Sequence, residues 1–515
     1  GLLLQSSQRM RARIKSSGDT NLIQKFESWQ EKKDYLAQLN YLSKAEREKR
    51  GINISEIKNE VNELEKALSL KSQDFKQVRE EKYYSWKDVR QKLKAGEAAL
   101  EIIRSRYIQK GSTDSVIYIA LIIKPETKKQ PEMVVLANGN ELEGKYLKRY
   151  RNAIEYQRST RIGYEQYWWP IAQQLTGIQK VYLSADGVFH QINLNTLKNP
   201  ASGKYLLEEM EIHQLSSTKD LVQKRLTSKI PQSESILMGR PKYNLSEDDH
   251  LTVVKDNAVA IRGGEAGFYT TREEMAQVQF SDLPGTEAET RQIFTLLKSK
   301  KQKAALYLGE NALEEVIKRA QSPKILHVAT HGFFFENNRT ISAQNQSRAH
   351  IEAGELDIDM GDLRPFNANV QSIQEIKTNP MLRSCIVLTG VSTYAQSKEK
   401  YVAEDGLLSA YEAQNLNLDN TELVVLSACE TGKGDLSYGE GVYGLQRGFL
   451  KAGAKSIIMS LWSVDDQATQ KLMTEFYTQW LSGKTKREAF RLAQSKLRAE
   501  YKYPFYWGGF VMVGE

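Results

Sequence analysis

The sequence predicts an α/β protein with a mostly parallel sheet flanked by helices, preceded by an N-terminal helical arm. Two segments, Ile325–Gly332 and Glu422–Gly434, each begin with an apolar run typical of a buried parallel strand. The first run leads to His331 and the second to Cys429. In an open α/β sheet the carboxyl ends of adjacent parallel strands lie side by side, so a general base and a thiol nucleophile could meet there.

Residues 1–95 are predicted to form the helical arm. They are rich in Lys, Glu, Gln and Leu, and six apolar residues follow an approximate a/d heptad register: Ile57, Val61, Leu64, Leu68, Phe75 and Val78. We expect a long helical hairpin or a coiled-coil arm. Because the chain opens at Gly1 in helical sequence, we also expect it to be part of a longer protein.

Residues 96–245 predict a first α/β domain. Strands are expected at Val116–Ile123, Val181–Ser184 and Ile236–Gly239. This region contains no cysteine, so it cannot supply a second thiol nucleophile and is interpreted as a supporting domain. Asp186 and His190 are interpreted as turn or interface residues.

Residues 246–282 are predicted to connect this domain to a second one at 283–515, which opens with LPGTEAET at the start of a long helix. Two polar segments of the second domain, 336–378 and 394–404, are predicted to be loops. Loops of this length in a compact domain are commonly functional or disordered, and both alternatives stay open here.

The two cysteines predict different roles. Cys429 ends its strand and precedes Glu-Thr-Gly-Lys-Gly, a sequence that suits an exposed turn. Cys385 heads the apolar run Cys385–Leu388 and is interpreted as a packing residue. Two cysteines in 515 residues provide no disulfide framework and indicate a reducing compartment.

His327 and His331 have the spacing of two zinc ligands on a helix, but the surrounding sequence excludes a zinc site. The glutamate that follows the first histidine of helical zinc motifs is replaced by Val328. In a strand, four residues span about 13 Å, too far for two ligands of one metal. We therefore expect His327 to be a hydrogen-bonded interior histidine, and we predict no metal site and no cofactor.

A set of motifs in order along residues 85–515 resembles the CHAT family of caspase-like peptidases, which are relatives of separase. The motifs are THG, NPMLRSCIVLTG, EDGLLSAYEAQNL, LSACETGKG, GEGVYGLQRGFLKAGAKSIIMSLWSVDD and YPFYWGGFVMVG. One departure is Cys385, where a small residue is expected. The resemblance implies a caspase-like fold, with a pseudo-caspase half at 96–245 and tetratricopeptide repeats upstream.

The resemblance also implies the site residues. It assigns His331 as the base and Cys429 as the nucleophile of a dyad, and it nominates the backbone N–H groups of Gly332 and Cys429 for the oxyanion. The dyad is chemically reasonable because a free thiol, with a pKa of about 8.5, needs a nearby imidazole to become a thiolate at neutral pH.

The segment Ser460–Thr469 resembles the part of separase whose aspartate lines the primary pocket and pairs with an arginine. The matching residue is Asp466, and Glu430 is a second acidic candidate that could equally be a turn residue. Alternatively, Asp465 or Asp466 caps the amphipathic helix that follows.

Composition limits the remaining functions. With 40% hydrophobic residues the chain can hold about three domains, and no apolar stretch is long enough to cross a membrane. The net charge of +8 comes from charges of both signs spread along the chain, so we expect no direct nucleic-acid binding. No GxxxxGK[ST] motif is present, which argues against nucleotide hydrolysis.

These observations lead to one hypothesis and one alternative. The hypothesis is a cytoplasmic cysteine endopeptidase that cleaves a specific partner protein, after a basic residue, in a prokaryotic signalling or defence pathway. A second protein partner is expected to activate it, and the oligomeric state stays open. The alternative is a catalytically silent scaffold of the same fold that binds protein partners through its helical region.

Overall fold

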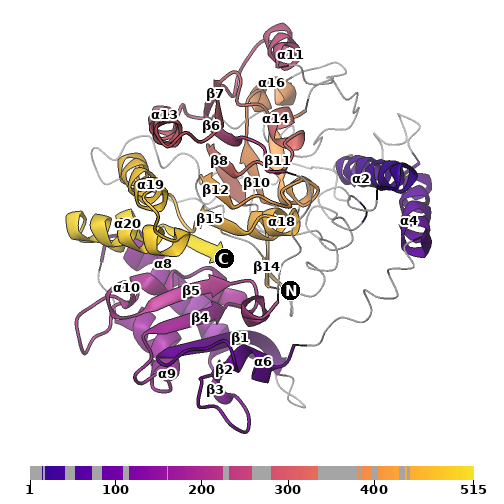
Figure 1. Ribbon diagram of the computed structural model, residues 1–515. Helices are drawn as coiled ribbons and strands as arrows, with labels where there is room; N and C mark the ends of the chain where they lie inside the picture. Colours follow the sequence, from indigo (N-terminus) through magenta and orange to yellow (C-terminus); the bar gives the residue numbers. More distant parts are fainter. Residues whose placement is uncertain are drawn as a thin grey trace, which may run out of the picture.

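One eleven-stranded sheet runs through the protein (Figure 1). The computed structural model describes residues 14, 18–40, 53–71, 84–107, 115–158, 161–223, 231–257, 280–334, 381, 384–396, 404–428, 435–437 and 441–515. In spatial order the strands are β3 (Glu132–Leu136), β2 (Ser115–Ile123), β1 (Glu97–Tyr107), β4 (Lys180–Ser184), β5 (Glu211–Leu215), β16 (Phe510–Gly514), β15 (Ser456–Ser460), β12 (Leu423–Ser427), β8 (Ile325–Ala329), β6 (Ser235–Pro241) and β7 (Ala304–Gly309).

The sheet is mostly parallel, as predicted. Neighbouring strands are antiparallel only at β3–β2, β2–β1 and β16–β15 among the described pairs. The central strands β8, β12 and β15 are buried along their whole length, because helices cover both faces. The predicted α/β class is therefore confirmed.

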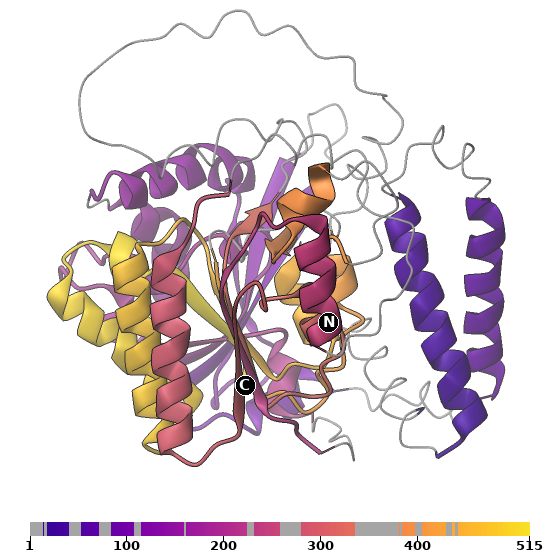
Figure 2. The same cartoon turned by 90° about the horizontal axis from the view of Figure 1, so that it is seen from above.

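Helices cover the two faces of the C-terminal half in separate groups (Figure 2). One face packs on α13 (Pro284–Ser299), α19 (Asp466–Leu481) and α20 (Lys486–Glu500). The other packs on α14 (Glu314–Lys318), α17 (Ala410–Ala413) and α18 (Leu445–Lys451). Side chains of β12 alternate between these two cores, as a strand with two buried faces requires. The predicted helix at LPGTEAET is α13.

The N-terminal half packs its helices against one face of β1, β2 and β4. These are α7 (Gly139–Glu141), α8 (Leu147–Glu155), α9 (Trp169–Ala172) and α10 (Leu206–Glu209), with single π turns at Leu142–Tyr146 and Tyr164–Trp168. A short helix, α6 (Trp86–Arg90), packs near β1 and β2 on the other face. Three 3₁₀ turns, η3 (Gly187–His190), η4 (Leu194–Thr196) and η5 (Thr218–Leu221), complete this half. Asp186 caps the first of them by accepting from the Gly187 N–H, which confirms its role as a turn residue.

The two halves of the sheet meet at a weak seam between β5 and β16. Only one residue pair, Val513 with Gln214, joins the two strands. Arg487 of α20 reinforces the seam by donating to the Gln214 carbonyl at 2.5 Å, to the Met512 carbonyl at 3.2 Å and to the Gly514 carbonyl. One guanidinium thus replaces ladder bonds where the strands diverge.

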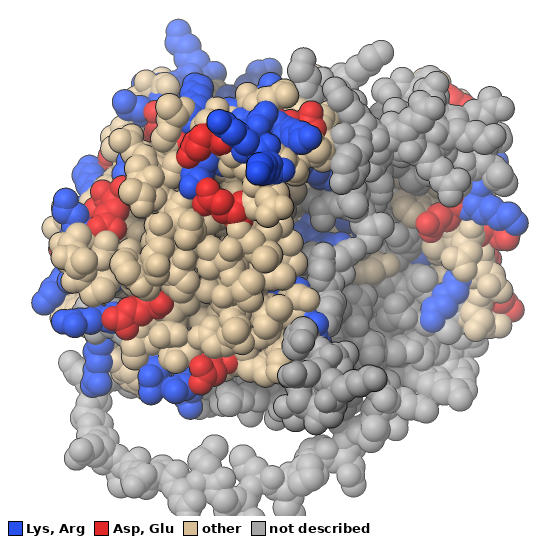
Figure 3. Space-filling model, turned by 90° about the horizontal axis from the view of Figure 1, so that it is seen from below, with Lys and Arg blue, Asp and Glu red and all other residues tan. Residues whose placement is uncertain are grey.

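Among the described residues of the helical arm, two helices, α2 (Thr20–Asn40) and α4 (Ile54–Lys71), stand beside the sheet and pack on each other (Figures 1 and 2). Val61 and Leu68 of the predicted heptad positions are buried, and Phe75 and Val78 lie outside the described residues. No described helix is long and apolar enough to cross a membrane. Figure 3, which views the protein from the β3 side, shows both signs of charge around a broad uncharged area.

The predicted limits between the domains differ from the pairing of the strands. Strand β6 was placed in the 96–245 domain, but it pairs with β7 and β8 of the C-terminal half. The predicted connection, 246–282, contains the helix α11 (Glu247–Asp256). The apolar run of β6 predicts a strand without naming its neighbour, because strand pairing depends on side chains far away in the sequence.

Two small sheets and two short helices complete the described chain. The first sheet has the order β11 (Leu407–Ser409), β10 (Ser384–Val387) and β9 (Gly332–Phe334), and the second pairs β13 (Asp435–Ser437) with β14 (Gly441–Tyr443). Helix α16 (Val391–Gln396) follows β10, and α21 (Pro504–Trp507) precedes β16. The predicted loop 336–378 lies outside the described residues, as do residues 397–403 of the second loop.

Close approach of α13 to β6 makes Gly239 sensitive to substitution. A Cβ atom there would lie 2.6 Å from the Thr286 carbonyl oxygen. We expect Gly239→Ala to lower the free energy of unfolding by about 1–3 kcal/mol, measured by urea denaturation. Gly144→Ala is the control, since nothing lies within 4 Å of its Cβ position, and it should leave stability unchanged or slightly higher. Equal stability of the two variants would contradict this packing.

Candidate active site

His331 lies between β8 and β9, and its imidazole is held by a backbone carbonyl. The Nε2 atom lies 2.9 Å from the carbonyl oxygen of Ser281. Because a carbonyl only accepts hydrogen bonds, Nε2 carries the proton, and Nδ1 is the basic nitrogen of the neutral ring. The rings of Tyr243 and Phe280 pack beside the imidazole, with centroids 5.3 and 6.0 Å away.

The strand that leads to Cys429 is the direct neighbour of the strand that leads to His331. Strands β8 and β12 are parallel and in register from Leu423 opposite Ile325 to Ser427 opposite Ala329. The Thr330 N–H then donates to the Ser427 carbonyl at 3.2 Å, and this bond ends the ladder. Cys429 and Glu430 lie outside the described residues, so their predicted roles stay predictions.

Gly332 presents its N–H away from the neighbouring strand. The Val387 N–H donates to the His331 carbonyl at 2.9 Å, which makes this position a hydrogen-bonded pair of the antiparallel ladder. Gly332 pairs with Ile386 at the next position, which is a non-hydrogen-bonded pair. The Gly332 N–H therefore points away from β10.

A small pocket opens at the carboxyl ends of β8 and β12. Its lining comes from these two strands, from α13 and from the start of α19: Leu283, Gly285, Thr286, Glu289, Thr330, Ser427, Ala428, Val464, Asp466 and Thr469. Gly285 permits the contact between α13 and α19, because its Cβ position lies 3.1 Å from the Asp466 Cβ. The cavity thus borders the residues that precede both members of the predicted dyad.

The structure separates the two aspartates at the start of α19. Asp465 is the N-cap, and its carboxylate accepts from the Ala468 N–H at 2.8 Å. Asp466 is the first residue of the helix and an exposed part of the cavity lining. The capping role that the sequence left open between them belongs to Asp465.

Beneath the cavity lies a buried polar network that joins four elements. Glu289 of α13 accepts from the Ser427 hydroxyl at 3.1 Å and lies 2.8 Å from His327 Nε2. The other ring nitrogen of His327 lies 3.1 Å from the Tyr477 hydroxyl of α19. His327 is completely buried, so the prediction of an interior, hydrogen-bonded histidine is confirmed.

Comparison with known proteins identifies the family. A family model described as the CHAT domain matches residues 158–515. The chain belongs to the CHAT domain family. Membership of this family supports a function of the peptidase type.

Individual proteins either match a smaller part of this chain than the family model does or have low sequence identity to it. Tetratricopeptide repeat protein 28 of Mus musculus and that of Homo sapiens are each 32% identical over 112 residues, which span 21% of this chain and 4% of theirs. Crystal structures of the Arg-specific cysteine proteinase gingipain R and of the Saccharomyces cerevisiae separase–securin complex are also similar. Gingipain R has a TM-score of 0.33 and 10% identity over 74% of this chain and 68% of its own. The separase–securin structure has a TM-score of 0.38 and 9% identity, over 83% of this chain and 31% of its own.

Cys385, the other cysteine of the CHAT domain, is a core residue. It is 1% exposed in β10, and burial raises the pKa of its thiol far above the ordinary value. A thiol that stays protonated is a poor nucleophile. The prediction that Cys385 packs in the core is confirmed.

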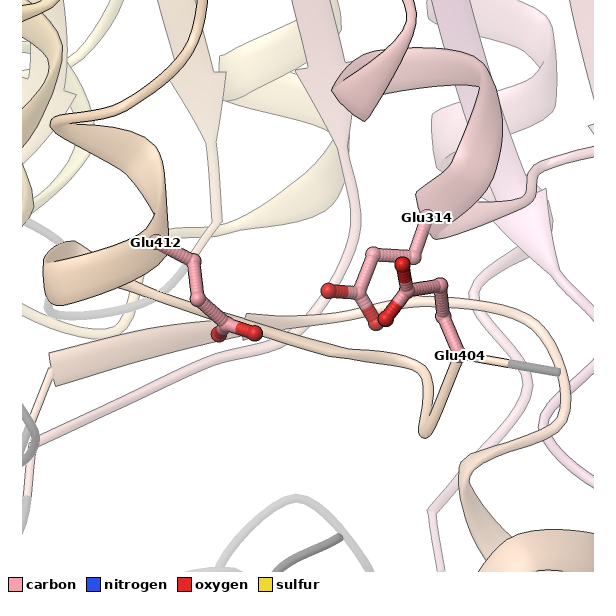
Figure 4. Close-up of side chains that lie close together, drawn as sticks. All are labelled: Glu314, Glu404 and Glu412. Carbon is pink, nitrogen blue, oxygen red and sulfur yellow. The ribbon is translucent and has the colours of Figure 1, made fainter. Parts of the chain in front are cut away.

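A group of carboxylates on the α14 side has the spacing of a metal site, but a lysine occupies it. Glu314, Glu404 and Glu412 point toward one another (Figure 4). The Lys318 ammonium lies 2.8, 2.8 and 3.0 Å from their oxygens, so a cation of the protein itself neutralises the group. The described residues therefore offer no reason to invoke a metal here.

Sequence reasoning missed three contributors to the site. The Ser281 carbonyl is a backbone group, which no residue-type motif can indicate. Phe280 precedes it in a segment that was predicted to be only a connection. Glu289 lies within the LPGTEAET motif, where its spacing from Leu283 shows a helix but not the strand ends that it reaches.

Lys318 should be essential for keeping its carboxylates buried. Burial raises the pKa of Glu314 above its ordinary value of 4.5, an effect that Lys318 opposes. The folded state therefore loses stability as the pH rises through that raised pKa, and it loses more when the ammonium is absent. We expect Lys318→Met to cost about 3–5 kcal/mol at pH 8 and clearly less at pH 5, measured by urea denaturation.

Lys145→Met is the control for this prediction. Lys145 makes an exposed pair with Glu141 at 4.0 Å, and its loss should leave stability nearly unchanged at both pH values. A cost of Lys318→Met that does not depend on pH would contradict the electrostatic explanation.

Proposed function

We propose that the chain is a cysteine endopeptidase in which His331 is the general base and Cys429 the nucleophile. One observation carries the proposal. The carboxyl end of β8, with an imidazole already oriented by the Ser281 carbonyl, lies beside the carboxyl end of β12, two residues before Cys429. The pocket at these two ends marks the place where a substrate side chain would bind.

The proposed reaction uses groups of this chain alone. His331 Nδ1 accepts the proton of the Cys429 thiol, and the thiolate attacks the carbonyl carbon of the scissile peptide. The N–H groups of Gly332 and Cys429 stabilise the resulting oxyanion. The imidazolium then gives its proton to the leaving amine as the C–N bond breaks. Water, deprotonated by His331, hydrolyses the thioester and restores the free thiol.

The primary pocket is proposed to accept a basic side chain. Asp466 lines the cavity and, since Asp465 caps α19, it is not needed for capping. A carboxylate at the mouth of a partly desolvated cavity pairs well with arginine or lysine. Glu430 is a second acidic candidate for this pocket.

The substrate is proposed to be a specific partner protein in a prokaryotic signalling or defence pathway within the cytoplasm. A second partner protein is proposed to bind the helical arm and activate the enzyme. The polar segments 336–378 and 397–404 are the proposed regulatory segments, because segments with few apolar residues can exchange between blocking and open states for a few kcal/mol. The alternative function, a silent scaffold, predicts partner binding without any cleavage.

The dyad can be tested with single substitutions. Cys429→Ala and His331→Ala should each abolish cleavage of proteins or peptides by the purified chain, because they remove the nucleophile and its base. Cys429→Ala should also leave thermal unfolding unchanged. Cys385→Ala should retain cleavage but lower stability, since it leaves a gap in a core position. Cleavage that survives Cys429→Ala would eliminate the proposed mechanism.

The two adjacent aspartates provide a matched test of the pocket. Asp466→Ala should reduce cleavage after arginine and lysine by at least tenfold, since one charge-assisted hydrogen bond is worth about 1.5–3 kcal/mol. It should also leave alkylation of Cys429 by iodoacetamide unchanged. Asp465→Ala should instead lower stability by about 1 kcal/mol and preserve the preference for basic residues. If wild-type protein cleaves equally well after apolar residues, Asp466 has no role in specificity.

A further inference from the structure

The polar network beneath the cavity connects the two strands that lead to the predicted dyad. Glu289 is 2% exposed, and its two carboxylate oxygens contact different strands, His327 of β8 and Ser427 of β12. His327 lies four residues before His331, and Ser427 lies two residues before Cys429. One carboxylate therefore bridges the two strands that lead to the predicted dyad.

The bridge spans the last three pairs of the backbone ladder between β8 and β12. His327 lies opposite Val425, and Ser427 lies opposite Ala329 in the last pair, which is followed only by the bond from the Thr330 N–H to the Ser427 carbonyl. Beyond that point no described backbone hydrogen bond joins the two segments. The carboxylate thus adds a side-chain connection to the carboxyl-terminal part of the ladder.

Glu289 is itself held firmly. Helix α13 approaches β6 so closely that its Thr286 hydroxyl accepts from the Arg240 N–H at 2.9 Å. A carboxylate only accepts, so His327 Nε2–H donates to it, and His327 Nδ1 lies 3.1 Å from the Tyr477 hydroxyl. Side chains of α13, α19, β8 and β12 thus form one connected hydrogen-bonded network.

We propose that Glu289 is a positioning residue for the His331–Cys429 dyad, acting through His327 and Ser427, which fix the carboxyl ends of β8 and β12 relative to each other. The inference rests on the proposed function. A displacement of about 1 Å between reacting groups can cost about 100-fold in rate, so a bridge at this point has a large effect on the chemistry.

The position and the charge of Glu289 have opposite effects on the thiol. If the bridge sets the distance from imidazole to sulfur, its removal weakens the thiolate–imidazolium pair, and the apparent pKa of Cys429 rises toward the ordinary thiol value of about 8.5. If Glu289 acted merely as a nearby negative charge, its removal would lower that pKa. The pH dependence of thiol reactivity therefore distinguishes positioning from a charge effect.

The test measures the rate of Cys429 alkylation by iodoacetamide against pH, by mass spectrometry, in the full chain, with buried Cys385 as the internal reference. Glu289→Ala removes both hydrogen bonds of the bridge, whereas Glu289→Gln removes only the charge, because its amide can still accept from His327 and donate to the Ser427 hydroxyl. In Glu289→Ala we expect the alkylation profile to move to higher pH and kcat for a cleaved peptide to fall about 10- to 100-fold with KM nearly unchanged, and we expect no shift to higher pH in Glu289→Gln. Glu287→Ala is the matched control on the same helix, where Glu287 pairs with Arg240 and Arg291 instead.

Ser427→Ala removes one half of the bridge and should shift the profile in the same direction as Glu289→Ala but by less, and it decides the question if Glu289→Ala does not fold. An unchanged profile in both variants, or a shift to lower pH, overturns the positioning role while wild-type Cys429 remains activated. A wild-type profile with an ordinary thiol pKa, together with no cleavage, instead overturns the proposed function itself.

Discussion

The parallel pairing of β8 with β12 is the constraint on which the candidate site depends. Residues 325 and 423 are far apart in the sequence, yet they lie opposite each other in the ladder. Parallel strands in register end at the same edge, so two side chains that follow such strands are brought together without any contact of their own. The helices on both faces make this pairing stable, because each strand buries apolar side chains in two cores. The site is thus a consequence of how the centre of the sheet is buried.

The N-terminal half of the sheet is joined to the C-terminal half through the weak β5–β16 seam. A single residue pair and the Arg487 guanidinium join the two halves of the sheet there. The η3 turn of the N-terminal half also contacts the β13–β14 hairpin, which follows the Cys429 segment. A half without any cysteine therefore touches the chain just beyond the predicted nucleophile. This contact supports the interpretation of residues 96–245 as a supporting unit.

The parts of the site that the sequence could indicate are those carried by local pattern. An apolar run that ends in Thr-His-Gly indicates both a strand and a residue at its end, and the fold class follows from several such runs. The Ser281 carbonyl could not be found in this way, because every residue has a carbonyl and only the fold decides which one faces His331. The same holds for Glu289 and for the neighbours of β6, since long-range pairing is specified by packing rather than by local residue type. Asp465 and Asp466 show the intermediate case, in which the sequence indicated the roles and the structure assigned them.

The buried network also bears on the choice between an enzyme and a silent scaffold. Burying a carboxylate, an imidazole and two hydroxyls costs desolvation free energy that their mutual hydrogen bonds recover only when every partner is in place. Apolar side chains of the same volume would make a core of equal or greater stability at this point. Stability alone therefore does not account for Glu289, His327, Ser427 and Tyr477 between α13, α19 and the two strands. The proposed dyad would require a fixed geometry at the strand ends, whereas a scaffold that binds through its helical arm would not.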